Sequence, residues 1–296
     1  MKCIPQILAL LIIPTLLSGC VKDELYREAN RVDAEMMATL PMALYESSGI
    51  QVSNPNRIWS HNDSNNTNEL FLIDSTGQLI RTVEVINATN VDWEDLALDD
   101  QNHMYINDAG NNDNDRQDLV IYRIPHPDTI ETDEVEAERI DFVFEDQSEF
   151  PPPESYRNFC IEATIWKDDS IFMFTKDRSN PITGYTKMYA VPAAPGEYVA
   201  TLIDSLYIDD ENHPARVTAA DHNPTTGEMV LLTRTRILSF TDFPGNRFFD
   251  GRIVDHQFSL LIGQTEAIAF VNDNEVYLTA EGSGGFPGHL FRVRLP

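Results

Sequence analysis

The apolar residues from about residue 40 onward occur in short runs rich in Val, Ile, Phe and Tyr. Clusters of Asn, Asp, Gly and Pro separate these runs at a spacing of roughly 8–12 residues, which is typical of an all-β domain. Upstream, Leu25, Ala29, Val32 and Met36 have the spacing of a weakly amphipathic helix or tether over residues 21–39. The pattern therefore predicts one all-β domain that follows a short non-β segment.

A sequence motif with charged residues at its two ends recurs within the all-β region. A Glu opens an apolar run, and about fifteen residues later a second apolar run ends on an acid, a period that favours a propeller or solenoid. The opening residues are Glu46, Glu94, Glu162 and Glu266, and the closing residues are Asp63, Asp108, Asp177 and Glu281. In the weakest copy, Thr218 and Arg234 take these two places.

The repeats can be written as four-strand units that begin near Glu46, Asp92, Phe159, Val217 and Glu266. The last unit has only three strands before the chain stops. The apolar run Thr39–Tyr45 is predicted to supply the missing outer strand, which would close the ring and remove exposed sheet edges. We therefore predict a five-bladed β-propeller over residues 40–296, with six blades as the alternative if the stretch 125–160 is divided.

The first residues have the features of a targeting segment. Lys2 precedes an apolar core from Ile7 to Leu17, and Leu17-Ser-Gly-Cys20 resembles a bacterial lipobox. We expect a signal peptide over 1–19, lipidation of Cys20 and a tether over 20–39; an ordinary secretory segment with a chance Cys is the alternative. Cys20-Val-Lys-Asp-Glu24 resembles the export signal of Bacteroidota lipoproteins, which implies an outer-membrane protein exposed at the cell surface.

The composition excludes some partners. The formal net charge is −27, which repels nucleic acid and anionic headgroups and attracts cations. We therefore expect a monomer that contacts the membrane only through its lipid anchor, binds no nucleic acid, and has a small polar or anionic ligand or an envelope protein as its partner. Once Cys3 and Cys20 are set aside, Cys160 is the one remaining cysteine, and its apolar surroundings favour a buried thiol.

The repeated acids predict a site. In a propeller blade the first strand lines the channel and is antiparallel to the second, so the opening and closing residues of each unit should meet at one mouth. Oxygen ligands suit a divalent cation such as Ca²⁺ or Mg²⁺. The metal candidates are Glu46, Glu94, Glu162, Glu266, Asp63, Asp108, Asp177 and Glu281, and the catalytic candidates are Glu94, Asp108, Arg116 and Arg234. The alternative is structural: the Glu side chains accept backbone N–H groups and hold neighbouring blades together.

Several phrases resemble a group of bacterial propeller lipoproteins and secreted proteins: Tyr45-Glu-Ser-Ser-Gly-Ile, Trp59-Ser-His-Asn-Asp-Ser, Asp92-Trp-Glu-Asp-Leu-Ala and Asn107-Asp-Ala-Gly-Asn-Asn. More distantly, the chain is similar to calcium-binding propellers such as phytase-like esterases and gluconolactonase-type lactonases. The resemblance implies a propeller fold, and the lactonase-type enzymes bind their metal through Glu, Asn and Asp.

Two functions follow as hypotheses. One is a metal-dependent hydrolase of phosphoester, lactone or glycan substrates, in which carboxylates hold Ca²⁺, one carboxylate activates water, and Arg116 or Arg234 stabilises anionic charge. The other is a non-catalytic module that recognises a glycan, a peptide or an envelope protein. The sequence contains no nucleophile elbow, phosphate-binding loop or zinc motif that would decide between them.

Overall fold

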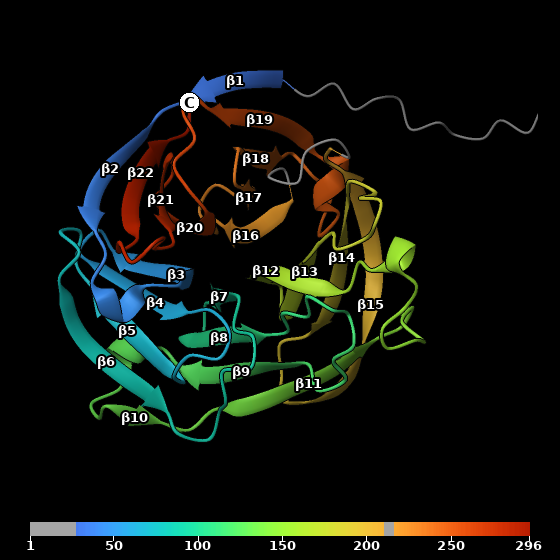
Figure 1. The fold of residues 1–296 in the computed structure, drawn as a ribbon, viewed down its shortest axis with the longest axis horizontal. Coiled ribbons are helices and arrows are strands. Elements are labelled where there is room, and N and C mark those ends of the chain that lie inside the picture. Colours follow the sequence, from blue (N-terminus) through green and yellow to red (C-terminus); the bar gives the residue numbers. More distant parts are fainter. Residues whose placement is uncertain (1–27, 210–215) are drawn as a thin grey trace, which may run out of the picture.

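The computed structural model describes residues 28–209 and 216–296. The signal peptide and lipidation site that we expected over 1–20 lie outside the described residues. Strands are arranged in a ring of sheets around a central axis, as Figure 1 shows. Short 3-10 helices lie in the connections, at Met42–Leu44 (η1), Pro127–Thr129 (η2), Glu154–Tyr156 (η3) and Phe248–Asp250 (η5).

The four sheets contain five antiparallel four-strand meanders, two of them in the eight-stranded sheet, and the first strand of each meander lies nearest the axis (Figure 1). The first meander has β3 (Ser47–Asn54), β4 (Arg57–Asn62), β5 (Glu69–Ile73) and β6 (Leu79–Val85). The second has β7 (Asp95–Leu98), β8 (His103–Asp108), β9 (Val120–Pro125) and β11 (Glu138–Phe144). The third has β12 (Cys160–Lys167), β13 (Ser170–Lys176), β14 (Tyr185–Pro192) and β15 (Gly196–Tyr207). The fourth has β16 (Val217–His222), β17 (Met229–Thr233), β18 (Arg236–Thr241) and β19 (Arg252–Phe258).

The last meander joins the two ends of the described chain. It has β20 (Thr265–Asn272), β21 (Glu275–Ala280) and β22 (His289–Arg294), and its outer strand is β2 (Ala34–Thr39), which pairs antiparallel with β22. A radial arrangement of such meanders is that of a β-propeller, so the predicted all-β propeller is confirmed.

The closing strand lies earlier in the sequence than predicted. We expected it at Thr39–Tyr45, but the strand ends at Thr39, and η1 follows from Met42. Pro41 explains the difference, because proline cannot donate to a strand ladder and here caps the 3-10 helix. Leu44 is therefore a buried residue of this 3-10 helix and does not belong to a strand.

The prediction of a helix or tether over residues 21–39 is also partly wrong. Residues 28–32 form β1 (Glu28–Val32), which adds a parallel fifth strand to β19, and residues 34–39 form β2. A hydrophobic spacing of three to four residues can arise by chance in short strands, and here pairing with two exposed sheet edges decided the structure. Two further parallel pairs lie at the outer edges, β11 with β15 and β10 (Glu134–Val135) with β6.

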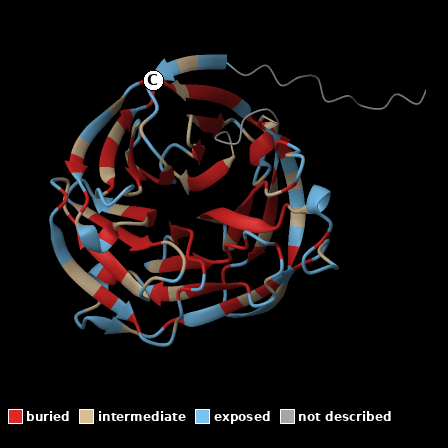
Figure 2. Cartoon of the chain, viewed as in Figure 1, coloured by how far each residue is buried: buried red, intermediate tan, exposed pale blue. Residues whose placement is uncertain are grey.

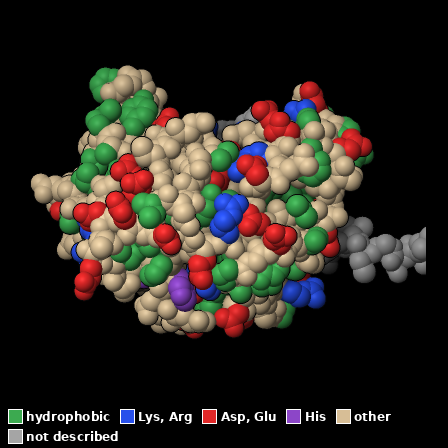
Figure 3. Space-filling model, turned by 90° about the horizontal axis from the view of Figure 1, so that it is seen from below, with side chains coloured by type: hydrophobic (Ala, Val, Ile, Leu, Met, Phe, Trp, Pro, Cys, Tyr) green, Lys and Arg blue, Asp and Glu red, His purple; other side chains and the backbone are tan. Residues whose placement is uncertain are grey.

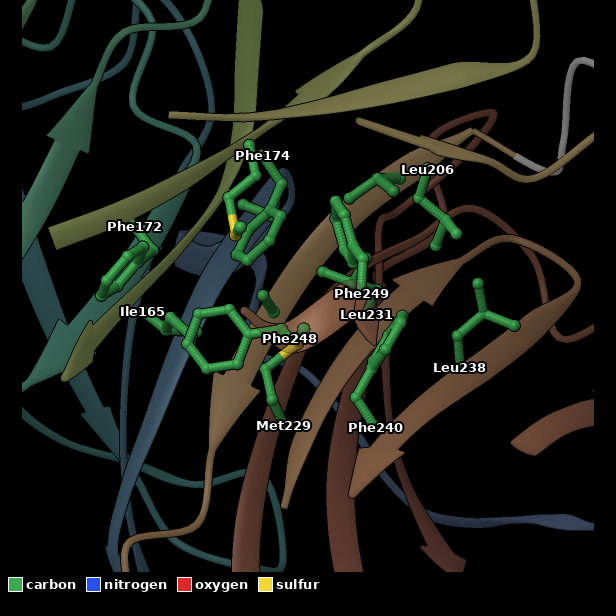
Figure 4. Close-up of a cluster of buried hydrophobic side chains, with 14 of the residues drawn as sticks. Ile165, Phe172, Phe174, Leu206, Met229, Leu231, Leu238, Phe240, Phe248 and Phe249 are labelled. Atoms are coloured by element: carbon green, nitrogen blue, oxygen red, sulfur yellow. The ribbon is translucent and has the colours of Figure 1, made fainter. Parts of the chain in front are cut away.

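The hydrophobic core is divided among the spaces between neighbouring sheets. Buried positions line the facing surfaces of the sheets, and exposed positions gather at loops and outer strands (Figure 2). One cluster packs the third meander against the fourth, where Phe172 meets Phe248 edge-on and Phe174 and Phe240 both contact Phe249 (Figure 4). Each sheet is therefore held by apolar contacts with its two neighbours.

Polar side chains tie the first strands together across the axis. Both Asp95 carboxylate oxygens are used: one accepts the N–H of Leu96, and the other accepts the N–H groups of Thr164 at 2.8 Å and Ala220 at 3.2 Å. Asp221 accepts the N–H of Phe270 at 2.7 Å. The bond to Ala220 joins the second meander to the fourth, and the bonds to Thr164 and Phe270 join consecutive meanders.

The surface carries acidic side chains over much of the face seen in Figure 3, with fewer basic ones between them. This agrees with the strongly negative net charge. Within residues 28–209 and 216–296, no helix has the length and apolar character needed to cross a membrane.

Candidate functional site

The repeated opening residues stand at bulges where each first strand begins. The pairing of the first two strands skips one residue in four meanders, and the extra residues are Ser48, Glu162, Thr218 and Glu266. In the remaining meander, Glu94 precedes β7 and donates its N–H to Asn107. A bulge redirects a side chain out of the regular alternation. Three of the five equivalent positions thus carry a Glu toward the same mouth.

The register of the first repeat was predicted wrongly. Ser48, and not Glu46, occupies the bulge, and the Ser48 hydroxyl donates to the Glu94 carbonyl in the neighbouring sheet at 3.0 Å. Glu46 lies two residues earlier and holds Asn66 through a 2.6 Å hydrogen bond. Thr218 makes the same kind of inter-sheet bond as Ser48, to the carbonyl of Thr265. The hydroxyl positions of the ring are therefore structural.

Two of the Glu residues are neutralised by a buried cation. Lys176, only 7% exposed, places its Nζ 2.5 Å from Glu162 Oε2 and 3.6 Å from Glu266 Oε2. Arg178 binds the other oxygen of Glu162 at 2.6 Å, and Arg234 binds Glu266 at 3.2 Å. Burial opposes ionisation of Glu162, but the adjacent Lys176 and Arg178 outweigh it and lower the pKa of Glu162 to about 2. These two acids are committed to ion pairs.

Three other carboxylates converge without such a partner. One oxygen each of Asp63, Asp92 and Glu94 lies within 4.8 Å of the others, and this set could hold a metal ion. Glu94 is 4% exposed and Asp92 is 7% exposed. Asp92 Oδ1 is buried and has no hydrogen-bond partner among the described residues. Gly110 makes room for the set, because a Cβ there would overlap Glu94 Oε1 and Asp92 Oδ2.

The electrostatics of the three carboxylates contrast with those of Glu162. Burial, with smaller contributions from neighbouring acids, raises the pKa of Asp63 to about 7 and that of Asp92 to about 6. Burial and the nearby charge of Glu162 also raise the pKa of Glu94. Buried acids of this kind are stabilised either by protons or by a bound cation.

Glu281 completes the acidic side of the mouth. Its carboxylate accepts a 2.6 Å hydrogen bond from Gln264, and burial together with the charge of Glu266 raises the pKa of Glu281 to about 8. A carboxyl group whose pKa lies near neutral pH can transfer protons under physiological conditions.

Two of the predicted closing acids are used by the protein itself. Asp177 accepts hydrogen bonds from the backbone and hydroxyl groups of Ser179 and Thr183, and so closes its own loop. Asp108 binds Arg116 at 3.0 Å and also accepts the N–H of Asp92 at 2.9 Å. Asp108 therefore positions Asp92, and neither Asp177 nor Asp108 belongs to the three-carboxylate set.

Arg116, a predicted catalytic residue, is occupied through Nε and Nη1, while its Nη2 is buried with no partner among the described residues. Besides Asp108 it binds Asp118 at 3.0 Å and the Gly110 carbonyl at 2.8 Å. It fixes the loop that carries Gly110 beneath the three carboxylates. Arg234, whose side chain is 36% exposed, remains at the rim of the mouth.

A second group of three potential ligands, Glu94, Cys160 and Glu162, suits a metal poorly. Burial raises the pKa of the Cys160 thiol to about 12, so the thiol stays protonated and donates to Glu162. Glu162 is already paired with Lys176. The predicted role of Cys160 as a buried thiol agrees with its full burial.

The sequence pattern missed Asp92 as a member of the set. It lies two residues before Glu94 in the phrase Asp92-Trp-Glu-Asp, outside the repeat that selected the other acids. The presence of three acids within four residues at the start of a first strand was the available signal. Asp92 and Glu94 face the mouth, whereas Asp95 points into the channel.

No protein-family model and no curated protein sequence matches the chain. Among solved structures, the PQQ-bound aldose sugar dehydrogenase of Streptomyces coelicolor is similar, with a TM-score of 0.51 and 9% identity over 89% of this chain and 98% of that one. A putative gluconolactonase has a TM-score of 0.49 and 12% identity, covering 89% and 92% of the two chains. A gluconolactonase from Xanthomonas campestris has a TM-score of 0.46 and 10% identity, covering 92% and 99%.

The predicted distant similarity to gluconolactonase-type propellers is thereby confirmed at the level of the fold. At such low identity the likeness extends to the fold alone. The chemistry of the mouth has to be argued from this chain's own residues.

Proposed function

We propose that the mouth binds one divalent cation, Ca²⁺, through Asp63, Asp92 and Glu94. The observation that carries the proposal is the convergence of three mostly buried carboxylates, of which Asp92 has an unpartnered oxygen, beside acids that already have their own cations. Ca²⁺ prefers several oxygen ligands in a flexible arrangement and can retain waters, which fits carboxylates supplied by loops and strand ends.

The same mouth has a basic side that would take an anionic ligand. Arg178 and Arg234 are partly exposed, and each binds its Glu through one end of the guanidinium group. Within the described ranges, Arg178 Nε is buried without a hydrogen-bond partner. A planar guanidinium group can bind a carboxylate or phosphate through two parallel hydrogen bonds. A small ligand with one anionic group could thus lie between the cation site and these arginines.

A metal-dependent hydrolase is the enzyme that this arrangement supports best. Bound Ca²⁺ would polarise an ester or lactone carbonyl or a phosphoryl oxygen. Glu281 would move the proton of the attacking water, since its pKa of about 8 lets it exist in both states near neutral pH. Arg234 and Arg178 would stabilise negative charge, in place of the structurally occupied Arg116.

We also propose the blade number and the membrane anchor that the sequence predicts. The five meanders would be the five blades of the propeller, and β2 would be the closing strand. Lipidation of Cys20 would anchor the domain at the outer face of the outer membrane. Because β1 and β2 belong to the sheets, the tether would be confined to residues between Cys20 and Glu28.

Calcium titration calorimetry on the purified protein tests the cation site. We expect one site that is lost or at least tenfold weaker in Asp92→Asn and Glu94→Gln, since each variant removes a charged ligand. Glu46→Gln is the matched control, because it removes a carboxylate of the same mouth. Glu46 contacts Asn66 and belongs to neither group of potential metal ligands. The control should bind Ca²⁺ like the wild type.

Equal binding in all variants would place the ion elsewhere and remove the basis for the hydrolase. Absence of binding in the wild type would instead favour the recognition module. In that case the groove over β14 becomes the feature to test, because it has a volume of about 680 Å³ and carries the exposed Tyr156 and Tyr185.

A further inference from the structure

A second cavity lies at the opposite mouth of the channel. The proposed calcium site stands where the first strands begin, whereas this cavity is lined where they end, by residues of β3, β7, β12, β16 and β20. Its volume is about 350 Å³, within the range of small-molecule sites. The side chains of Asp95 and Asp221 cross-link the first strands between the two mouths. The cavity is therefore a separate site.

Part of the cavity wall is apolar and aromatic. Trp166 and Phe270 come from β12 and β20, and Val52 and Leu98 come from β3 and β7. All four side chains are half-buried, so each keeps some surface open. Trp166 is also the partly exposed tryptophan of the chain, since Trp59 and Trp93 are fully buried.

The charge in the cavity is negative. Asp99, Asp100, Asp221 and Asp273 line it, and no Lys or Arg is among the described lining residues. Burial lowers the pKa of His222 to about 4, so this histidine adds no positive charge at neutral pH. A cavity with acidic walls of low dielectric constant concentrates cations.

Asp221 is half-buried, whereas Asp100 and Asp273 are exposed, and its carboxylate keeps capacity for a ligand. It accepts a 2.7 Å hydrogen bond from Phe270 N–H and a 3.5 Å one from Gln51, and the backbone N–H of His222 also interacts with it. A carboxylate can accept about four hydrogen bonds. Asp99, by contrast, is occupied by the backbone and ring of His103 and by the Tyr105 hydroxyl.

We propose that this cavity binds a small organic amine, with its ammonium group on Asp221 and its apolar body against Trp166 and Phe270. Aromatic faces attract cations as well as apolar groups. A metal ion fits this end of the channel less well, because both described groups of three potential metal ligands lie at the other mouth.

Tryptophan fluorescence titration with phenethylammonium tests the proposal, and 2-phenylethanol is the neutral probe of matched shape. We expect saturable binding of the amine to the wild-type protein. The alcohol should bind the wild type about tenfold or more weakly, and so should the amine bind Asp221→Asn, because the charge pair is lost in both cases. Val52→Trp fills the cavity without touching Asp221 and should also abolish the saturable response. Glu94→Gln and added Ca²⁺ should leave amine binding unchanged, which separates this site from the calcium site.

Equal binding of the amine and the alcohol would overturn the proposal, as would the absence of saturable binding of the amine. Circular dichroism shows whether each variant folds. If Asp221→Asn does not fold, the Val52→Trp variant and the neutral probe decide. If Ca²⁺ displaced the amine, or if Glu94→Gln no longer bound the amine, the response would belong to the other mouth and the proposal would also be overturned.

Discussion

We expect Lys176→Met to lower the free energy of unfolding by about 3–5 kcal/mol, the usual effect of removing one partner from a buried ion pair. The substitution would leave Glu162 and Glu266 buried, with Arg178 and Arg234 as their remaining cations. Denaturant unfolding at pH 7 measures the change. The effect arises from the uncompensated charges, since Met has about the size of Lys and keeps the apolar part of the side chain.

Lys167→Met is the matched control for this prediction. Lys167 pairs with the exposed Asp168, so the same substitution there should cost at most about 1 kcal/mol. The pKa of Glu162 is lowered to about 2 in the folded protein, so the stability that Glu162 contributes is present above its ordinary pKa and lost as the pH falls toward 2. The deficit of Lys176→Met should therefore shrink in acid; a deficit equal to that of the control would contradict the account.

Asp95→Ala should have a comparable effect, for a different reason. Its carboxylate accepts the N–H groups of Leu96, Thr164 and Ala220, and each buried N–H left without a partner costs about 1–3 kcal/mol. We expect a loss of about 3–5 kcal/mol in the free energy of unfolding, measured in urea.

Two variants sharpen this second prediction. Asn keeps one acceptor oxygen but places an NH2 donor against the N–H groups at the other position, so Asp95→Asn should recover only part of the stability that Asp95→Ala loses. Asp74→Ala removes an exposed acid that also accepts backbone N–H groups, and water can replace it there at a cost of about 1 kcal/mol or less. A loss for Asp95→Ala no greater than for Asp74→Ala would show that the cross-links do not hold the channel.

The fold could be predicted to a large extent because a repeated strand pair leaves a local trace in the sequence. The alternation of apolar and turn residues located each meander, and the missing strand indicated closure by the N-terminal region. The position of that strand could not be predicted from the apolar run alone. Pro41 ended it, and the unpaired edges of β19 and β22 recruited residues 28–39, a long-range effect that no local pattern encodes.

The site was predictable in part for the same reason. The repeat identified Glu94, Glu162 and Glu266 as equivalent, but it could not show which acids a buried Lys176 would neutralise. The misplaced Glu46 differs from Ser48 by two residues, a shift that preserves the strand face and is invisible to the alternation pattern. Asp92 lies outside the repeat, and only its position beside Asp63 and Glu94 reveals its role.

Thermal unfolding of the protein with and without Ca²⁺, at pH 8 and pH 5, tests the proposed cation site most directly. The pKa values of Asp63 and Asp92 are raised to about 7 and about 6, so without metal the stability due to these groups is present in acid and lost as the pH rises through these values. We expect Ca²⁺ to raise the Tm at pH 8, where the carboxylates are ionised, and to have little effect at pH 5, where protons occupy them. An unchanged Tm at pH 8, or an equal rise in Glu94→Gln, would contradict a calcium site in this mouth.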